Sequence, residues 1–134
     1  MRVTTEEEML EFGEEVARGL DVNVIELTGD VGVGKTTFTR GLAKGLGVKE
    51  PVTSPSFTIS KSYLTADGRT LTHYDFYRLG DVGLMQEDLD EKLADPEQIV
   101  VIEWGEAVKD LLPENHLKIE IKLNDDGSRD IMMA

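Results

Sequence analysis

The sequence predicts an α/β fold of three layers, built on a sheet that mixes parallel and antiparallel strands. Apolar strands expected at residues 22–27 and 98–102 are each followed by a helical pattern, which is typical of parallel strands joined by helices. Asp67-Gly68 and Asp126-Gly127 each lie between two extended segments, and this arrangement predicts antiparallel hairpins. The length of 134 residues fits one domain, residues 1–134.

The first half of the chain predicts a helix, a buried strand, a second helix and a loop. Apolar residues recur at helical spacing in the first segment, where Thr5 with Glu8 fits a capping box. A glycine-rich turn follows the strand, and Gly47 closes the second helix. These elements are expected at residues 4–20, 22–27, 35–46 and 51–56.

The second half predicts mainly strands. Two of them flank the first hairpin turn, and a helical pattern centred on Leu89 follows. A short apolar strand comes next, and then a short helix that Pro113 ends. The strand after it alternates apolar and polar residues, so one of its faces is expected to meet solvent. The expected strands are residues 57–64, 69–77, 98–102 and 117–123 with a last one near Ile131, and the short helix is residues 106–112.

Composition excludes several classes of protein. The chain has no cysteine, and no apolar run approaches the roughly 20 residues of a membrane span. The acidic start does not resemble a signal peptide, so we expect a cytoplasmic protein with no membrane contact. With 27 acids and 14 bases, the net charge is −13, which disfavours direct, tight binding to RNA. The acidity either suits a basic partner protein or only maintains solubility.

The segment that begins at Gly29 matches the phosphate-binding pattern G-x-x-x-x-G-K-[ST]. Glycines let successive backbone N–H groups face one anion, and the following helix points its positive end at the same place. Lys35 is expected to reach the β- and γ-phosphates, and Thr36 to ligate Mg²⁺. The pattern predicts a P-loop NTPase-like fold that binds a nucleoside triphosphate and Mg²⁺, and the missing guanine-reading Asn-Lys-x-Asp motif favours ATP over GTP. The expected nucleotide-binding residues are Asp30, Val31, Gly32, Val33, Gly34, Lys35, Thr36 and Thr37.

Two acids are candidates for the magnesium side of this site. Glu103 ends an apolar strand, where a second acid of a P-loop site commonly lies. Asp75 lies among aromatic residues at a strand end, and it either binds magnesium through water or orients the attacking water. His73 and His116 show no triad or metal partner in the sequence, so we expect structural roles for them.

The combined motifs resemble one family, the bacterial ATPase TsaE (formerly YjeE), which serves tRNA threonylcarbamoyladenosine synthesis. The segments that carry the resemblance are GDVGVGKTTFTR (29–40), TSPSF (53–57), HYDFYRL (73–79) and VIEW (101–104). Their order and spacing also fit, and the similarity covers nearly the whole chain. Where the family often has SPT, this chain has Ser54-Pro55-Ser56, and residues 81–93 are only loosely similar.

The resemblance implies partners and residue roles. TsaE proteins act with TsaD and TsaB, which modify adenosine 37 of tRNA, so this chain is expected to meet tRNA only through that complex. Lys35, Glu103 and Asp75 correspond to the catalytic residues, and Thr36, Glu103 and Asp75 to the metal site. A switch or partner surface is expected at Thr53, Ser54, Ser56 and Trp104, and adenine contacts at Thr5 and Arg129.

Two other functions fit the P-loop. One is a small kinase acting on a metabolite, although such kinases generally bring arginines onto the phosphates with a mobile lid. The chain has six arginines, none of them clustered. The other is a nucleotide-dependent binding switch whose hydrolysis is incidental. Because no arginine lies in an obvious loop facing the P-loop, we expect slow hydrolysis alone and acceleration by partner proteins.

Overall fold

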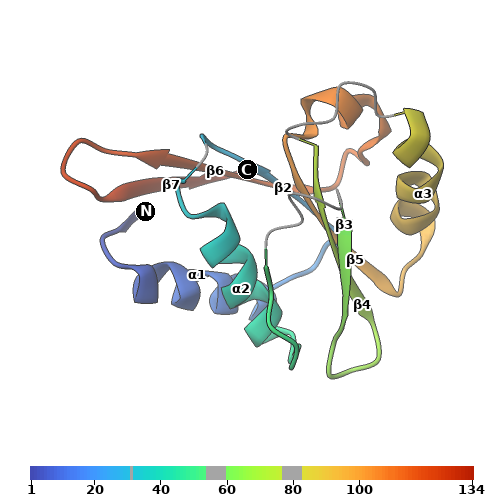
Figure 1. Cartoon of the computed structure of the whole chain (residues 1–134), viewed down its shortest axis with the longest axis horizontal. Helices are drawn as coiled ribbons and strands as arrows, with labels where there is room; N and C mark the ends of the chain where they lie inside the picture. The colour runs from blue at the N-terminus through green and yellow to red at the C-terminus, as the bar shows by residue number, and fades with distance from the viewer. Residues whose placement is uncertain (31, 54–59, 77–82) are drawn as a thin grey trace.

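The computed structural model describes residues 1–30, 32–53, 60–76 and 83–134. Within them, seven strands form one sheet in the order β1-β7-β6-β2-β5-β4-β3 (Figure 1). The central strands β6, β2, β5 and β4 are parallel, whereas β1, β7 and β3 pair antiparallel at the two sides. The strands are β1 (Arg2–Val3), β2 (Val24–Thr28), β3 (Ser60–Leu64), β4 (Thr70–Asp75), β5 (Gln98–Glu103), β6 (Leu117–Leu123) and β7 (Arg129–Met133).

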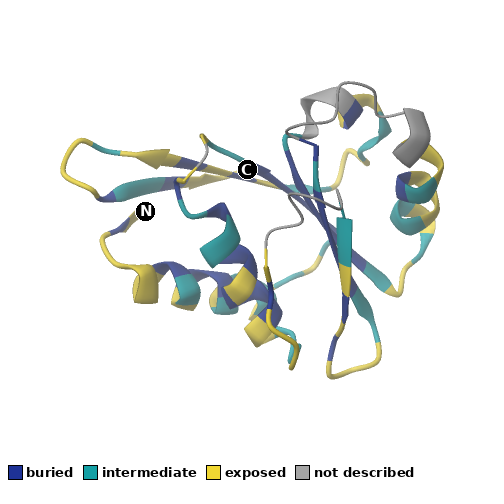
Figure 2. Cartoon of the chain, in the orientation of Figure 1, coloured by how far each residue is buried: buried dark blue, intermediate teal, exposed yellow. Residues whose placement is uncertain are grey.

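Helices cover the sheet on both faces, which confirms the predicted three-layer α/β fold. Helices α1 (Glu6–Arg18) and α2 (Lys35–Gly45) lie together on one face, and α3 (Gly83–Ala94) lies on the other (Figure 1). The buried residues form two clusters, one on each side of the central strands (Figure 2). This burial holds β2 and β5 in place. The glycine-rich turn follows the end of β2, and Glu103 is the last residue of β5.

Helices α1 and α2 approach so closely that glycine is required between them. A Cβ on Gly41 would lie 2.2 Å from the carbonyl oxygen of Leu10, and one on Gly13 would lie 2.4 Å from that of Phe38. Phe12 and Phe38 then pack with ring centroids 5.5 Å apart. The contact fixes the direction of α2, whose first residue is Lys35.

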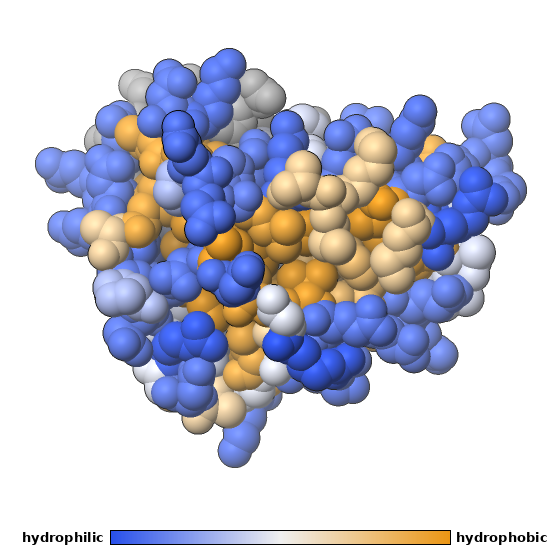
Figure 3. All heavy atoms as spheres, turned by 180° about the vertical axis from the view of Figure 1, so that it is seen from behind, coloured by the Kyte–Doolittle hydropathy of each residue, from blue (hydrophilic) through white to orange (hydrophobic). Residues whose placement is uncertain are grey.

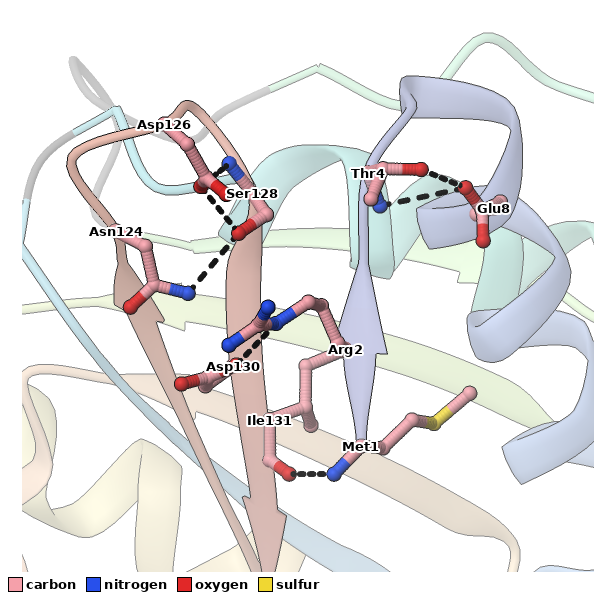
Figure 4. A network of polar contacts seen from close by, with 9 residues as sticks. All are labelled: Met1, Arg2, Thr4, Glu8, Asn124, Asp126, Ser128, Asp130 and Ile131. Carbon is pink, nitrogen blue, oxygen red and sulfur yellow. Dashed lines mark hydrogen bonds and ion pairs between the residues drawn. The ribbon is translucent and has the colours of Figure 1, made fainter.

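The N-terminus differs from the prediction that a helix begins at Thr4. Residues 2–3 instead form β1 on the edge of β7, where Arg2 pairs with Asp130 and the terminal amine donates to the carbonyl of Ile131 (Figure 4). The helix begins after Thr5, whose hydroxyl accepts from the Glu8 amide at 3.1 Å. The Glu8 carboxylate bonds Thr4 rather than the Thr5 amide, so the predicted capping box is present in a shifted form.

The other predicted elements are present with small changes in their ends. The predicted strands at 57–64 and 69–77 are described as Ser60–Leu64 and Thr70–Asp75, and residues 57–59 and 77 lie outside the described residues. The short helix predicted at 106–112 is a 3₁₀ helix, η1 (Gly105–Leu111). In β6 the buried residues Ile119 and Ile121 alternate with exposed ones, as predicted for a strand with one face in solvent.

Apolar side chains also gather on the face seen from behind (Figure 3). A groove of about 360 Å³ lies between the end of α1 and strands β6 and β7, and none of its lining residues belongs to the P-loop. Its lining residues are Phe12, Glu15, Val16, Gly19, Leu20, Asp21, Leu117 and Met133. Within the described residues, no helix is both long and apolar enough to cross a membrane.

Candidate nucleotide-binding site

The glycine-rich turn between β2 and α2 has the backbone that a phosphate loop requires. Gly29, Gly32 and Gly34 have φ values of 150°, 84° and 110°, a region that favours glycine. A Cβ on Gly29 would lie 2.6 Å from the carbonyl oxygen of Ile121 and would collide with β6. Gly34 is the N-cap of α2, so the positive end of this helix faces the turn. The described glycines of the turn therefore have the backbone conformations that a phosphate loop uses.

Lys35 lies at the start of α2 with its side chain folded into the site. Its Nζ donates to the carbonyl of Gly29 at 2.8 Å and lies 3.6 Å from Oε1 of Glu103. The same Nζ is 4.4 Å from the centre of the Trp104 ring, which is cation–π geometry. Only 6% of the lysine is exposed. A buried ammonium needs such partners because its desolvation is costly.

Glu103 is the last residue of β5 and is almost fully buried. One carboxylate oxygen faces Lys35, and the other bonds to Nε2 of His73. The sequence showed no partner for His73, and the structure supplies one in Glu103, a contact that does not contradict the structural role expected for His73. A signal was present in the sequence: residues two apart on a strand share a face, so His73 lies on the same face of β4 as the candidate acid Asp75.

Asp75 ends β4 and is the register partner of Glu103 on the neighbouring parallel strand. Directly paired residues lie on the same face of a sheet, so both acids belong to the face covered by α2. The structure thus brings together Lys35, Glu103 and Asp75, the three residues that the sequence predicted to be catalytic.

The residues at this edge of the sheet fit a magnesium ion bound together with phosphates. Thr36 and Thr37 are half-buried in the first turn of α2, and within the described residues no hydrogen bond forms to their hydroxyl groups. Among these residues no cluster of three His, Cys, Asp or Glu could hold a metal alone. Mg²⁺ usually keeps waters and is bound through one or two carboxylates plus substrate phosphates.

Two residues predicted to border the adenine differ in how they approach the P-loop. Arg129 Nε donates to the carbonyl of Val33 at 2.7 Å, so this side chain lies against the loop. Thr5 caps α1, and Met9 of the same helix would lie 3.2 Å from a Cβ on Gly34. The adenine contacts themselves stay predictions.

The predicted switch or partner surface is described only in part. The Thr53 hydroxyl accepts from Lys61 Nζ, and the Thr53 backbone bonds to the Tyr63 hydroxyl. These contacts hold the start of the 53–57 segment against β3. Ser54 and Ser56 lie outside the described residues, as does Val31 of the P-loop.

Trp104 adopts a left-handed backbone conformation, with φ 59° and ψ 47°. This conformation costs a bulky side chain on the order of 1–2 kcal/mol. It turns the chain out of β5 directly after Glu103 and leaves the indole ring over Lys35. Such strain at a non-glycine residue is often found at functional sites.

Arg40 and His116 have structural partners elsewhere in the fold. Arg40 Nε donates to the carbonyl of Val52 at 3.0 Å, which joins α2 to the segment after it. His116 contacts the carbonyl of Pro113 at 2.6 Å and Glu26 at 3.3 Å. The structural role expected for His116 agrees with these contacts.

The three-layer fold, the glycine conformations of residues 29–34 and the lysine at the start of α2 define a P-loop protein of the α/β class. Comparison with known proteins identifies the family within this class. Residues 3–131 match the family model "Threonylcarbamoyl adenosine biosynthesis protein TsaE", and the chain belongs to this family.

Individual relatives agree with this assignment. The chain is 41% identical over 115 residues to the tRNA threonylcarbamoyladenosine biosynthesis protein TsaE of Streptomyces coelicolor, a match that covers 84% of this chain and 78% of that protein. It is 41% identical over 111 residues to the TsaE protein of Bacillus subtilis, covering 81% and 67%. The crystal structure of Bacillus subtilis YdiB superposes with a TM-score of 0.79 at 32% identity, covering 99% of this chain and 82% of that one.

Proposed function

We propose that this chain binds and hydrolyses Mg²⁺-ATP and thereby supports TsaD and TsaB homologues in forming N6-threonylcarbamoyladenosine at position 37 of tRNA. The observation that carries the proposal is the convergence of the Lys35 ammonium and the Glu103 carboxylate beside a glycine turn shaped for an anion. The family assignment supplies the biological process, since the relatives are named for threonylcarbamoyladenosine biosynthesis.

The chain's own side chains take distinct roles in this proposal. Lys35 leaves Glu103 and binds the β- and γ-phosphates, and the N–H groups at the start of α2 bind the same charge. The hydroxyl of Thr36 and the carboxylates of Glu103 and Asp75 form the metal side, with Asp75 either holding a metal-bound water or orienting the attacking water. Bound Mg²⁺ would neutralise part of the negative charge of the phosphates.

The contacts of the described arginines support partner stimulation; Arg78 lies outside the described residues. Efficient hydrolysis by P-loop proteins commonly uses an arginine on the γ-phosphate, worth about 10³–10⁵ in rate. Among the described arginines, Arg129 contacts the P-loop, and its Nε is already bonded to a backbone carbonyl. Arg40 is bonded to another carbonyl. We therefore propose that the TsaD–TsaB complex completes the catalytic site in trans or by ordering the chain near Thr53.

The direct experiment measures ATP turnover by the purified chain, alone and with the TsaD and TsaB homologues of the same organism. Slow turnover alone and marked acceleration by the pair are expected. Fast hydrolysis without acceleration would contradict completion by partners. A phosphorylated small molecule as the product would instead favour a kinase, and binding to the partners that depends on ATP without any turnover would favour a switch.

A further inference from the structure

The structure assigns to His73 the role of positioning Glu103 for magnesium-dependent nucleotide binding. The assignment rests on the proposed function, because it presupposes that Glu103 serves the magnesium side of the site. His73 is a positioning residue in this account, since it touches Glu103 and acts only through that carboxylate.

The surroundings of His73 are unusual for a histidine that only fills space. The side chain is fully buried in β4, and its Nε2 bonds to Oε2 of Glu103. Its Nδ1 has no hydrogen-bond partner among the described residues. A buried polar atom without a partner costs free energy that an aliphatic side chain would avoid. The contact with Glu103 is therefore the feature that accounts for an imidazole at this position.

The need for a second holder of Glu103 follows from the position of Lys35. Oε1 of Glu103 lies 3.6 Å from the Lys35 ammonium. When Lys35 turns to the phosphates, that contact is weakened. The bond from His73 does not depend on the nucleotide, so it keeps Oε2 fixed. The free oxygen, Oε1, then stays directed toward the start of α2, where Thr36 lies.

The contacts also select one form of the imidazole ring. A carboxylate accepts hydrogen bonds, so Nε2 carries the proton that it shares with Glu103. The contact therefore requires a proton on Nε2. This arrangement matches metal sites in which an outer hydrogen bond orients the ligand.

The test compares ATP affinity with and without Mg²⁺, measured by calorimetry, in variants of His73. In His73→Leu, the gain in affinity that Mg²⁺ provides should fall by about 10-fold or more, as for other outer contacts of metal ligands. Affinity without Mg²⁺ should stay within about threefold of wild type, because Lys35 and the glycine turn are unchanged. A general structural role would weaken both affinities together.

Two amide variants give a rescue that depends on geometry. Glutamine places its amide near the position of Nε2, so His73→Gln should restore most of the Mg²⁺-dependent gain. Asparagine places its amide near Nδ1, so His73→Asn should not. His116→Leu is the matched control, because His116 also contacts a carboxylate, Glu26, but lies outside the P-loop site. It should leave both affinities unchanged.

The outcomes separate this inference from the proposed function. If Glu103→Gln removes the Mg²⁺-dependent gain while a folded His73→Leu retains it, the positioning role is wrong and the magnesium role of Glu103 stands. If neither substitution affects that gain, Glu103 does not serve magnesium. The positioning role of His73 and the magnesium role of Glu103 in the proposed function are then both wrong. Should His73→Leu not fold, ¹⁵N NMR of the wild-type ring decides: a proton on Nε2, with and without nucleotide, is expected, and a proton on Nδ1 instead would overturn the assignment.

Discussion

The Nζ of Lys35 lies 3.6 Å from Oε1 of Glu103, and both side chains are almost completely buried. The carboxylate is thus a direct counter-ion of the lysine. On the proposed function, phosphates that enter the glycine turn compete with Glu103 for the same ammonium. On the proposed function, this exchange frees one oxygen of Glu103 at the moment when the magnesium side of the site is needed.

The exchange should be visible in the fluorescence of Trp104, the single tryptophan of the chain. Its ring lies 4.4 Å from the Lys35 ammonium, and removing a nearby cation changes the emission of an indole. Adding Mg²⁺-ATP should shift the emission of wild type. The Lys35→Met variant lacks the cation from the start and should show little further change; an equal response in both proteins would rule out lysine movement as its source.

Substitutions of the two acids should affect turnover more than nucleotide binding. Glu103→Gln and Asp75→Asn keep the size of each side chain and remove its charge at the paired ends of β5 and β4. Turnover with the partners present should fall by about 10²-fold or more, whereas ATP affinity should change far less. Glu97→Gln, at an exposed site before β5, is the matched control. Turnover at the wild-type rate in both acid variants would contradict the catalytic roles of Glu103 and Asp75.

The close approach of α1 and α2 predicts a strong effect of one methyl group. Gly41→Ala should destabilise the fold by about 1–3 kcal/mol, because the new Cβ would lie 2.2 Å from the carbonyl oxygen of Leu10. Alanine is the better helix former, so propensity alone predicts the opposite sign. At Gly19 the nearest atom would be 3.8 Å away, so Gly19→Ala should be tolerated. Urea unfolding of both variants distinguishes packing from propensity.

The bond between Tyr74 and Asp88 predicts a stability difference that depends on pH. Burial and the carboxylate of Asp88 raise the pKa of Tyr74, and the Tyr74 hydroxyl in turn lowers the pKa of Asp88. Because the pKa of Asp88 is lower in the folded state, this bond stabilises the fold above the ordinary aspartate pKa of about 4. That contribution is lost as the pH falls through the folded-state pKa.

Tyr74→Phe should therefore lower the free energy of unfolding by about 1 kcal/mol at pH 7, a value discounted because Asp88 is partly exposed. At acid pH, below the folded-state pKa of Asp88, the difference from wild type should be smaller. Tyr63→Phe is the control, since the Tyr63 hydroxyl bonds to the backbone of Thr53 and not to an acid. If Tyr74→Phe lowered the free energy of unfolding equally at both pH values, Asp88 would not be the cause of the loss.

The sequence predicted the elements that have strong local signals. The glycine turn, Lys35 and the strand ending in Glu103 are each specified by residues close in the chain, and their convergence follows from the parallel pairing of β2 with β5. β1 was not predicted, because a two-residue strand has no periodicity and forms only where β7 offers an edge. A 3₁₀ helix such as η1 likewise has no apolar spacing that distinguishes it from a short α-helix.

The residues of the site could be predicted from the sequence, but the contacts between their side chains could not. His73 lies 30 positions before Glu103, and their bond depends on the register of β4 with β5, which no local pattern specifies. The left-handed backbone of Trp104 is equally hidden, since glycine or asparagine is the usual signal for that conformation. Pairing across strands thus decides which polar residues meet, and sequence spacing only narrows the candidates.

The affinity of the chain for Mg²⁺-ATP, measured in wild type and Lys35→Ala, tests the central claim most directly. Loss of the ammonium that faces the phosphates should weaken binding by about 10-fold to 100-fold. Lys44→Ala, which removes an exposed lysine of the same helix, should leave affinity unchanged. Equal affinity for Mg²⁺-ATP in wild type and a folded Lys35→Ala variant, or no binding by wild type at all, would contradict the assignment of the glycine turn as a nucleotide site.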